Sequence, residues 1–171
     1  MLLTMKKIIC TMLFIVISVT MNSCSADTAE GTENSSSTEK VVMNYTYNDS
    51  ELETMQAINN YRVSIGLNAL QKINHISSKC EEHNEYMIEK AVVDHSDFVA
   101  RSENIMKLLG AKNVGENVAY NYKTADAVLQ SWLASPGHKK NIEGNYTHFG
   151  ISVTIDPRTG NKYYTNIFAR I

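Results

Sequence analysis

The spacing of apolar residues changes toward the C-terminal end of this chain, and this change limits the folds open to it. Within residues 52–65, 73–91 and 128–133 the apolar residues recur every three or four positions, which is the period of a helix with one buried face. Apolar and polar residues then alternate from Phe149 to Ile155, and a second run of this kind covers Lys162 to Arg170. Val114 to Tyr120 is a further predicted strand. Helices followed by a hairpin predict an α+β or three-layer arrangement, with helices on the faces of a small sheet.

Local signals place the ends of two helices. Ser50 and Glu53 have the spacing of a capping box, in which each side chain bonds a backbone N–H at the helix start, and Gly66 suits the left-handed residue that ends the helix. Thr124 is the candidate cap of a later helix. Pro136 ends that helix, because the residue before a proline is pushed out of the helical region.

A row of residues between these two helices predicts another helix with one buried face. Its members are Ile73, Ile76, Cys80, His83, Met87 and Ala91. We expect Cys80 to be a small core residue. We expect His83 to be a hydrogen-bonded core histidine and not a ligand.

The first residues are typical of a secretory signal. The pair Lys6-Lys7 gives the positive start, an uncharged apolar stretch runs from Ile8 to Val19, and the small residue Ser23 precedes Cys24. The stretch is shorter than the roughly 20 apolar residues that a spanning helix needs. An uncleaved anchor and a short buried helix are the alternatives. We therefore expect export to the cell envelope or the extracellular space.

The chain has three cysteines, and their positions leave no pair for an intrachain disulfide. Cys10 lies inside the signal. The run from Met21 to Cys24 resembles a bacterial lipobox, with Met-Asn where Leu-Ala is usual, so Cys24 is the predicted lipidation site and membrane anchor. Only Cys80 remains in the folded part, and an intermolecular bridge is the alternative. An exported domain without a disulfide depends on its core alone.

The predicted domain organisation has three parts. Residues 1–23 form the signal peptide, residues 24–48 the lipid-modified cysteine with a flexible polar tether, and residues 49–171 one folded domain. The tether has too few apolar side chains to fold, and as a random coil it would reach roughly 25 to 30 Å. The formal net charge is −2, which lacks the electrostatic footprint of a nucleic-acid binder. Nucleic acid is therefore not an expected partner.

Three side chains with ligand chemistry stand at or beyond the ends of predicted elements: His95, Glu116 and His138. The common phosphate-loop, zinc-helix and serine-elbow motifs are absent from the sequence. Two imidazoles and a carboxylate suit a divalent transition metal with an open coordination position. The alternatives are a helix-capping role for His95, a surface carboxylate at Glu116 and a solvated basic turn at His138.

Short motifs along the chain are similar, in order, to those of a bacterial CAP (SCP-like) domain. That family includes cysteine-rich secretory, venom-antigen and plant pathogenesis-related proteins. The resemblance covers about Ser50 to Ile171, and its most specific elements are Gly115-Glu116-Asn117 and Ser135-Pro136-Gly137-His138. The other matching segments are Ile58 to Arg62, Gly66-Leu67, Leu70, His83, Met87, His95, Val118-Ala119, Ser131 to Ile142 and Phe149 to Val153. The resemblance implies an α-β-α sandwich with a small central antiparallel sheet.

The resemblance also implies a cleft built from acidic and imidazole side chains. Family members with a full cavity carry two histidines and two glutamates, of which His95, Glu116 and His138 match three, while Ser135 stands at the second glutamate. Asn117 and Ser135 are the expected cleft-lining residues. A hydroxyl cannot supply the charge of a carboxylate, so zinc or another divalent cation should bind more weakly than in the animal relatives, or the ligand should differ.

The leading hypothesis from the sequence is an envelope-tethered CAP-type binding module. Its His95/Glu116/His138 cleft would hold a divalent cation and a small apolar or cell-wall ligand. One alternative is a metal- or serine-dependent peptidase or esterase, with Glu116 or His138 as the base and Ser135 as a nucleophile. A carboxylate cannot easily serve both as ligand and as base, which weighs against catalysis. The other alternative is a structural interaction domain without a metal site.

Overall fold

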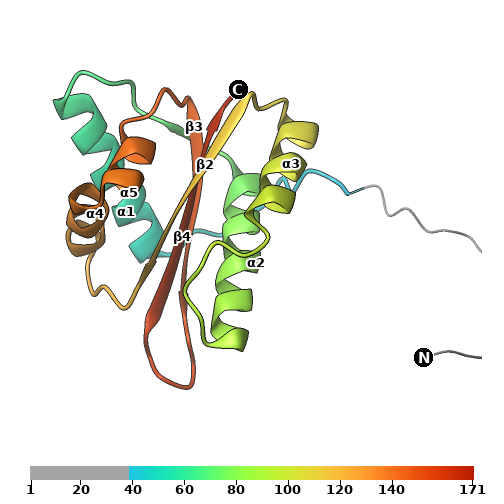
Figure 1. Cartoon of the computed structure of the whole chain (residues 1–171), viewed down its shortest axis with the longest axis vertical. Coiled ribbons are helices and arrows are strands. Elements are labelled where there is room, and N and C mark those ends of the chain that lie inside the picture. Colours follow the sequence, from blue (N-terminus) through green and yellow to red (C-terminus); the bar gives the residue numbers. More distant parts are fainter. Residues whose placement is uncertain (1–38) are drawn as a thin grey trace, which may run out of the picture. The chain divides into compact units, whose positions relative to one another are not determined.

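The computed structural model describes residues 39–171, so the expectations for the signal peptide, Cys24 and most of the tether lie outside it. Helices cover both faces of one sheet (Figure 1). One face carries α1 (Asp49–Ser64), α4 (Ala125–Ala134) and α5 (Pro136–Ile142), and the other carries α2 (Asn74–Lys90) and α3 (Phe98–Leu109). The predicted three-layer α+β sandwich is confirmed. In this range no helix has the length and apolar character that crossing a membrane requires.

Within the described range the sheet has four strands in the order β1-β3-β4-β2. These are β1 (Gln71–Lys72), β2 (Asn113–Tyr120), β3 (His148–Ile155) and β4 (Lys162–Arg170). The predicted hairpin is β3 with β4, and the predicted strand β2 pairs antiparallel with β4. The short β1 runs parallel to β3, so the sheet is mixed and not wholly antiparallel as expected. Strand β2 lies at the free edge of the sheet.

Helix α1 begins at a different capping box from the one predicted. The side chain of Asn48 accepts from the N–H of Glu51 at 3.0 Å, and the Glu51 carboxylate accepts from the N–H of Asn48 at 2.9 Å. Glu51 is buried, and its other oxygen accepts from the N–H of Val153 in β3 at 2.9 Å. The prediction of a Ser50 cap was wrong because this contact with the sheet favours the earlier start.

Two of the helices had no counterpart in the sequence analysis. Helix α3 follows Asp97, which is left-handed with a φ of 59° and makes no side-chain cap bond, and only Arg101 and Ile105 of this helix are buried. Helix α5 begins at Pro136, a position where the missing N–H of proline breaks no helical bond. The proline therefore ends α4, as predicted, and also starts α5.

The residues just before α1 contact helix α2. Glu39 pairs with Lys79 at 2.6 Å, and the N–H of Val42 donates to Nδ1 of the buried His75 at 3.2 Å. These bonds join residues 39–48, which belong to the predicted tether, to the folded domain.

The apolar core lies on both faces of the sheet. Met55, Ile58, Trp132, Phe149 and Phe168 pack on the side of α1, α4 and α5. On the side of α2 and α3 the core includes Ile76, Cys80, Ile105 and Ile167. Cys80 is free and fully buried, which confirms its expected role as a core residue.

Gly150 of β3 lies directly against the backbone of α2. A Cβ atom at this position would lie 2.4 Å from the backbone nitrogen of Ser77 and 2.6 Å from the carbonyl carbon of Ile76. Helix α2 can therefore pack this closely on the sheet only because residue 150 has no side chain.

We expect Gly150→Ala to lower the free energy of unfolding by about 1–3 kcal/mol, because backbone atoms cannot move aside as the end of a flexible side chain can. Gly137→Ala is the control: a Cβ there meets open space, and alanine in a helix is favoured over glycine by about 1 kcal/mol. Denaturant unfolding measures both changes. A Gly150→Ala protein as stable as the wild type would contradict the close packing.

Candidate functional site

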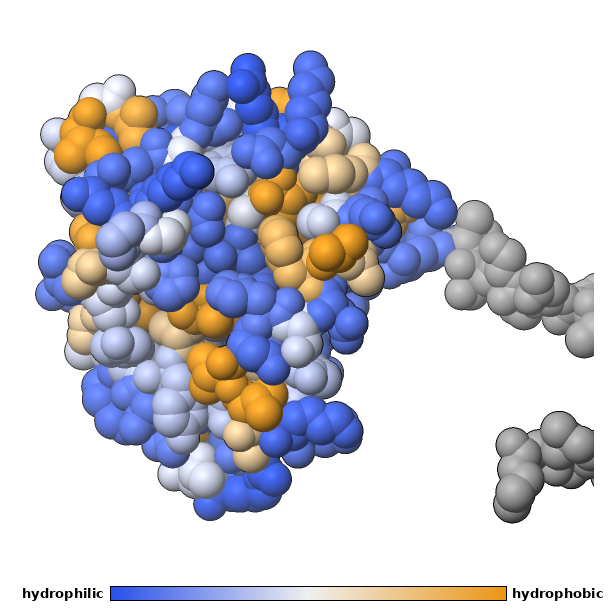
Figure 2. Space-filling view, in the orientation of Figure 1, coloured by the Kyte–Doolittle hydropathy of each residue, from blue (hydrophilic) through white to orange (hydrophobic). Residues whose placement is uncertain are grey.

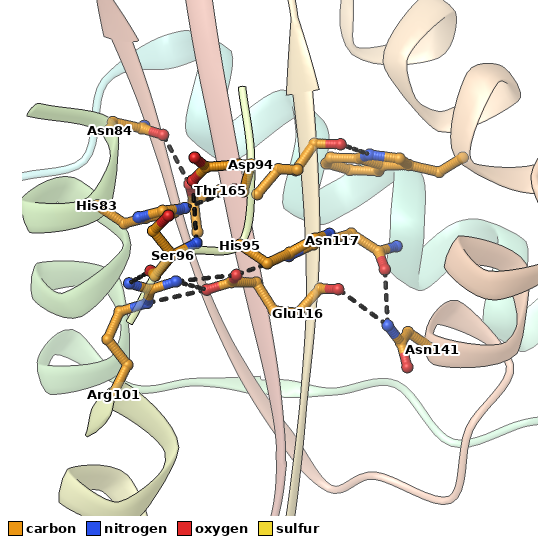
Figure 3. A network of polar contacts seen from close by, with 12 residues as sticks. His83, Asn84, Asp94, His95, Ser96, Arg101, Glu116, Asn117, Asn141 and Thr165 are labelled. Carbon is orange, nitrogen blue, oxygen red and sulfur yellow. Dashed lines mark hydrogen bonds and ion pairs between the residues drawn. The ribbon is translucent and has the colours of Figure 1, made fainter. Parts of the chain in front are cut away.

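Glu116 on β2 is the centre of a buried polar cluster (Figure 3). Its side chain is 1% exposed. The guanidinium of Arg101 on α3 donates from Nε to Oε2 at 3.0 Å, and from Nη2 to Oε1 at 3.0 Å and to Oε2 at 2.8 Å. Such a bidentate, charge-assisted pair offsets the cost of removing two charges from water. Arg101 was missed by the sequence analysis, and its guanidinium bonds both carboxylate oxygens of Glu116.

His95 lies in the loop between α2 and α3, where its Nδ1 is 2.8 Å from Oε1 of Glu116. An ionised carboxylate only accepts hydrogen bonds, so in the neutral ring Nδ1 carries the proton and Nε2 keeps its lone pair. The His95 side chain is 47% exposed, while Glu116 behind it is buried. Glu116 thus orients a solvent-facing imidazole.

Two buried side chains hold the backbone on either side of His95. His83 donates from Nε2 to the carbonyl of Asp94 at 2.9 Å, and Arg101 donates from Nη1 to the carbonyl of Ser96 at 2.7 Å. His83 is a hydrogen-bonded core histidine, as predicted, and burial lowers its pKa. The position of His83 on an apolar row of α2 indicated a buried histidine. The sequence did not show that its hydrogen bond would support the loop of His95.

His138 on α5 is the third predicted site residue. Its ring centroid is 6.4 Å from that of His95, with the two planes tilted by 51°. Burial is the main cause that lowers the pKa of His138, and the neighbouring charge of His95 lowers it further. The two rings, drawn from separate elements, therefore lie close together, and the His138 ring is neutral near neutral pH.

Asn117 and Asn141 attach α5 to the edge strand β2. Asn117 is fully buried and donates to the backbone carbonyl of His138 at 3.1 Å. The Asn141 amide donates to the carbonyl of Glu116 at 3.0 Å and to Oδ1 of Asn117 at 2.9 Å. Asn117 was expected to line the cleft, and the structure places it beneath the cleft, where it positions His138.

Ser135 and His138 line a hollow of about 360 Å³ along β2. Its other walls include Trp132, Tyr120 and Tyr122. Ser135 is the N-cap residue of α5 but makes no side-chain cap bond. Among residues 39–171 no hydrogen bond joins the Ser135 hydroxyl to the His138 ring.

The three predicted residues meet, but the carboxylate does not fit a metal-ligand role. Both oxygens of Glu116 accept from Arg101, and one also accepts from His95. In the part of the chain that the structure describes, no group of three or more His, Cys, Asp or Glu side chains is arranged to hold a metal ion. Only the two imidazoles are left for a cation.

We expect Arg101→Met to lower the free energy of unfolding by about 3–5 kcal/mol, because Glu116 would stay buried without its partner. The double variant Arg101→Met/Glu116→Met removes both charges and should recover much of this loss. Denaturant unfolding at neutral pH compares the two proteins. If Arg101→Met unfolds at the wild-type midpoint, the pair does not support the fold in this way.

Comparisons with known proteins agree with this architecture. The protein YkwD of Bacillus subtilis, described as uncharacterized, is 33% identical over 128 residues, which are 72% of this chain and 48% of YkwD. The chain thus spans about half the length of this curated relative.

Two solved structures share the fold. An extracellular SCP-domain protein from Bacillus anthracis is 25% identical with a TM-score of 0.59, over 75% of this chain and 45% of that one. An outer surface protein from Borrelia burgdorferi is 17% identical with a TM-score of 0.61, over 68% of this chain and 88% of that one. A family model matches residues 55–168, which is more than half of the sequence. The chain therefore belongs to the CAP family, the cysteine-rich secretory protein family.

Proposed function

We propose that this chain is an exported, lipid-anchored binding module of the cell envelope, whose cleft between His95 and His138 takes a small cell-wall ligand. The extracellular and outer-surface descriptions of similar structures support export. The lipobox-like run that ends at Cys24 supports the anchor. A polar tether after the anchor would let the domain reach wall material beyond the lipid headgroups.

The two neighbouring imidazole rings, 6.4 Å apart between centroids, carry this proposal. His95 is oriented by the buried Glu116, and His138 is held through its backbone by Asn117. His138 lines the hollow of about 360 Å³ together with the aromatic side chains of Trp132 and Tyr122, and His95 lines another hollow, of about 580 Å³, beside α3. Ligand sites typically combine such apolar walls with a few fixed polar groups.

The distribution of apolar side chains on the surface also supports a small, local ligand. Figure 2 shows a largely hydrophilic face with apolar residues in separate patches. Exposed apolar residues such as Val63, Val99 and Ile155 belong to different elements. A broad apolar docking surface would instead gather such residues in one large patch.

Hydrolysis is less well supported than binding. A serine nucleophile is activated by a hydrogen bond to its base, and in the described residues Ser135 has no such bond to His138. Glu116 is poorly placed to act as a general base, because both of its oxygens accept from Arg101. We therefore propose a binding function.

The full chain should sediment with purified bacterial cell walls, and His95→Ala/His138→Ala should weaken this binding by at least about tenfold, because both imidazoles are lost from the centre of the cleft. The bound fraction is measured over a series of wall concentrations. His148→Ala is the matched control, since it removes a histidine at the start of β3 that bonds Thr147. The proposal is rejected if the wild type does not bind, or if the double variant binds equally well.

A divalent cation is a second candidate ligand, which the closeness of the two imidazoles favours. Zinc is commonly bound by imidazole nitrogen. With Glu116 held by Arg101, and with Ser135 at the place of the second family glutamate, the chain offers two nitrogen ligands and no free carboxylate from this set. We therefore propose that the two imidazoles bind zinc weakly.

In a calorimetric titration with zinc, the full chain should show weak binding that His95→Ala/His138→Ala abolishes. Glu116→Gln should keep this binding, because the carboxylate is engaged by Arg101 and is not a ligand. Circular dichroism checks that each variant is folded. Loss of zinc binding in Glu116→Gln would support the hypothesis that Glu116 is a third zinc ligand. Equal zinc binding by all three proteins would rule out a zinc site at His95 and His138.

A further inference from the structure

The pairing of β2 fixes which of its backbone groups face the open edge of the sheet. In an antiparallel pair, alternate residues direct both N–H and C=O toward the partner strand. The carbonyls of Glu116 and Val118 accept from Asn141 Nδ2 and Trp132 Nε1, each at 3.0 Å, so these residues face away from β4. By the same alternation Tyr120 also directs its N–H and C=O away from β4.

The edge of β2 is closed at one end and open at the other. Asn141 and Trp132 cover it at Glu116 and Val118, as side chains often protect an edge strand. At Tyr120, by contrast, no side chain within residues 39–171 bonds the backbone N–H or C=O, and the residue is 39% exposed. Tyr120 is thus a short stretch of unpaired sheet edge.

The hollow beside His138 runs along this open stretch. Val118, Tyr120 and His138 all line it. Tyr120 also forms a wall of a second hollow of about 420 Å³, which includes Tyr163 and Arg158. A chain lying on the edge could therefore continue past Tyr120 but would have to stop at Trp132.

The closed end carries no net negative charge from its buried groups. Arg101 balances the charge of Glu116, and the imidazole rings of His95 and His138 bring no negative charge. Lys139 and Lys140 follow directly on α5. These charges favour a carboxylate at this end over a second cation.

We propose that the free edge of β2 binds an extended peptide as a short antiparallel strand, with the C-terminal carboxylate of the peptide at His138. The peptide residue opposite Tyr120 exchanges two main-chain hydrogen bonds with it. The last peptide residue lies at the end of the open stretch, where Trp132 already occupies the Val118 carbonyl, and its carboxylate faces the His138 ring. Strand addition to a sheet edge is an established mode of peptide recognition. The inference rests on the proposed function of this cleft and names its ligand class.

Trp132 is the only tryptophan in the chain and lines the hollow, so its fluorescence reports occupancy. The probe is the peptide acetyl-Ala-Val-Ala-Ala with a free carboxyl end, titrated into the full chain. We expect a saturable change, and about tenfold weaker binding for the same peptide with an amidated end, because the charge-assisted contacts are lost. Equal binding of both peptides would overturn the placement of the carboxylate.

Two substitutions of Tyr120 distinguish the contribution of its backbone N–H to peptide binding from that of its side chain. Tyr120→Pro removes the outward N–H, which an edge strand tolerates, while Tyr120→Val keeps it and loses the same aromatic ring. We expect Tyr120→Pro to bind the peptide about tenfold more weakly than Tyr120→Val, because one main-chain hydrogen bond is lost. Equal affinities of the two variants would overturn the edge pairing.

N-methylated peptides test the same main-chain pairing with Tyr120 on the wild-type protein. Methylation of the valine nitrogen removes the donor to the Tyr120 carbonyl and should weaken binding about tenfold, whereas methylation of the next alanine, whose N–H points away, should have a smaller effect. The reverse order would overturn the proposal. So would a fluorescence response to chitotriose, a glycan, with none to the peptide. Cell-wall binding that depends on His95 and His138 would survive these failures, which keeps the two proposals distinguishable.

Discussion

The site depends on the buried ion pair between Arg101 and Glu116. Removing either charge from water is costly, and the pair is stable only because both oxygens of the carboxylate are bonded by one guanidinium. The same guanidinium also bonds the carbonyl of Ser96, so one side chain joins α3, the His95 loop and β2. The orientation of His95 and the charge of the cleft both follow from this pair.

The other side of the site is built where α4 and α5 cover the edge of the sheet. Trp132 packs in the core, and its indole N–H also closes the edge at Val118. Asn141 does the same at Glu116 while bonding Asn117, which holds His138. The cleft of this CAP domain therefore lies next to the part of the β2 edge that Asn141 and Trp132 do not cover. Its hollow, which His138 lines, reaches the exposed Tyr120.

Regular patterns in the sequence predicted the elements that are amphipathic or alternating. Helix α2 is confirmed, because its buried residues recur at helical spacing. The hairpin and β2 are also confirmed, although helices on both faces of the sheet bury the central residues of these strands without alternation. The end of α4 is confirmed because Pro136 marks it. Helix α3 was missed because one of its two buried residues is Arg101, a charge that hides the apolar period. Helix α5 was missed because Pro136 signals an end and a beginning equally well.

The sequence by itself determined the α+β class, the family motifs and the three residues His95, Glu116 and His138, because these depend on residue type and local spacing. Only the tertiary structure decided what these residues do together. Glu116 on β2 is bonded by Arg101 from α3 and by Asn141 from α5, and His83 on α2 holds the loop of His95, so each of these contacts joins different elements. A buried carboxylate needs a partner charge, and the chain alone does not show which one folding will bring to it. That partner, the guanidinium of Arg101, is what sets the chemistry of the cleft.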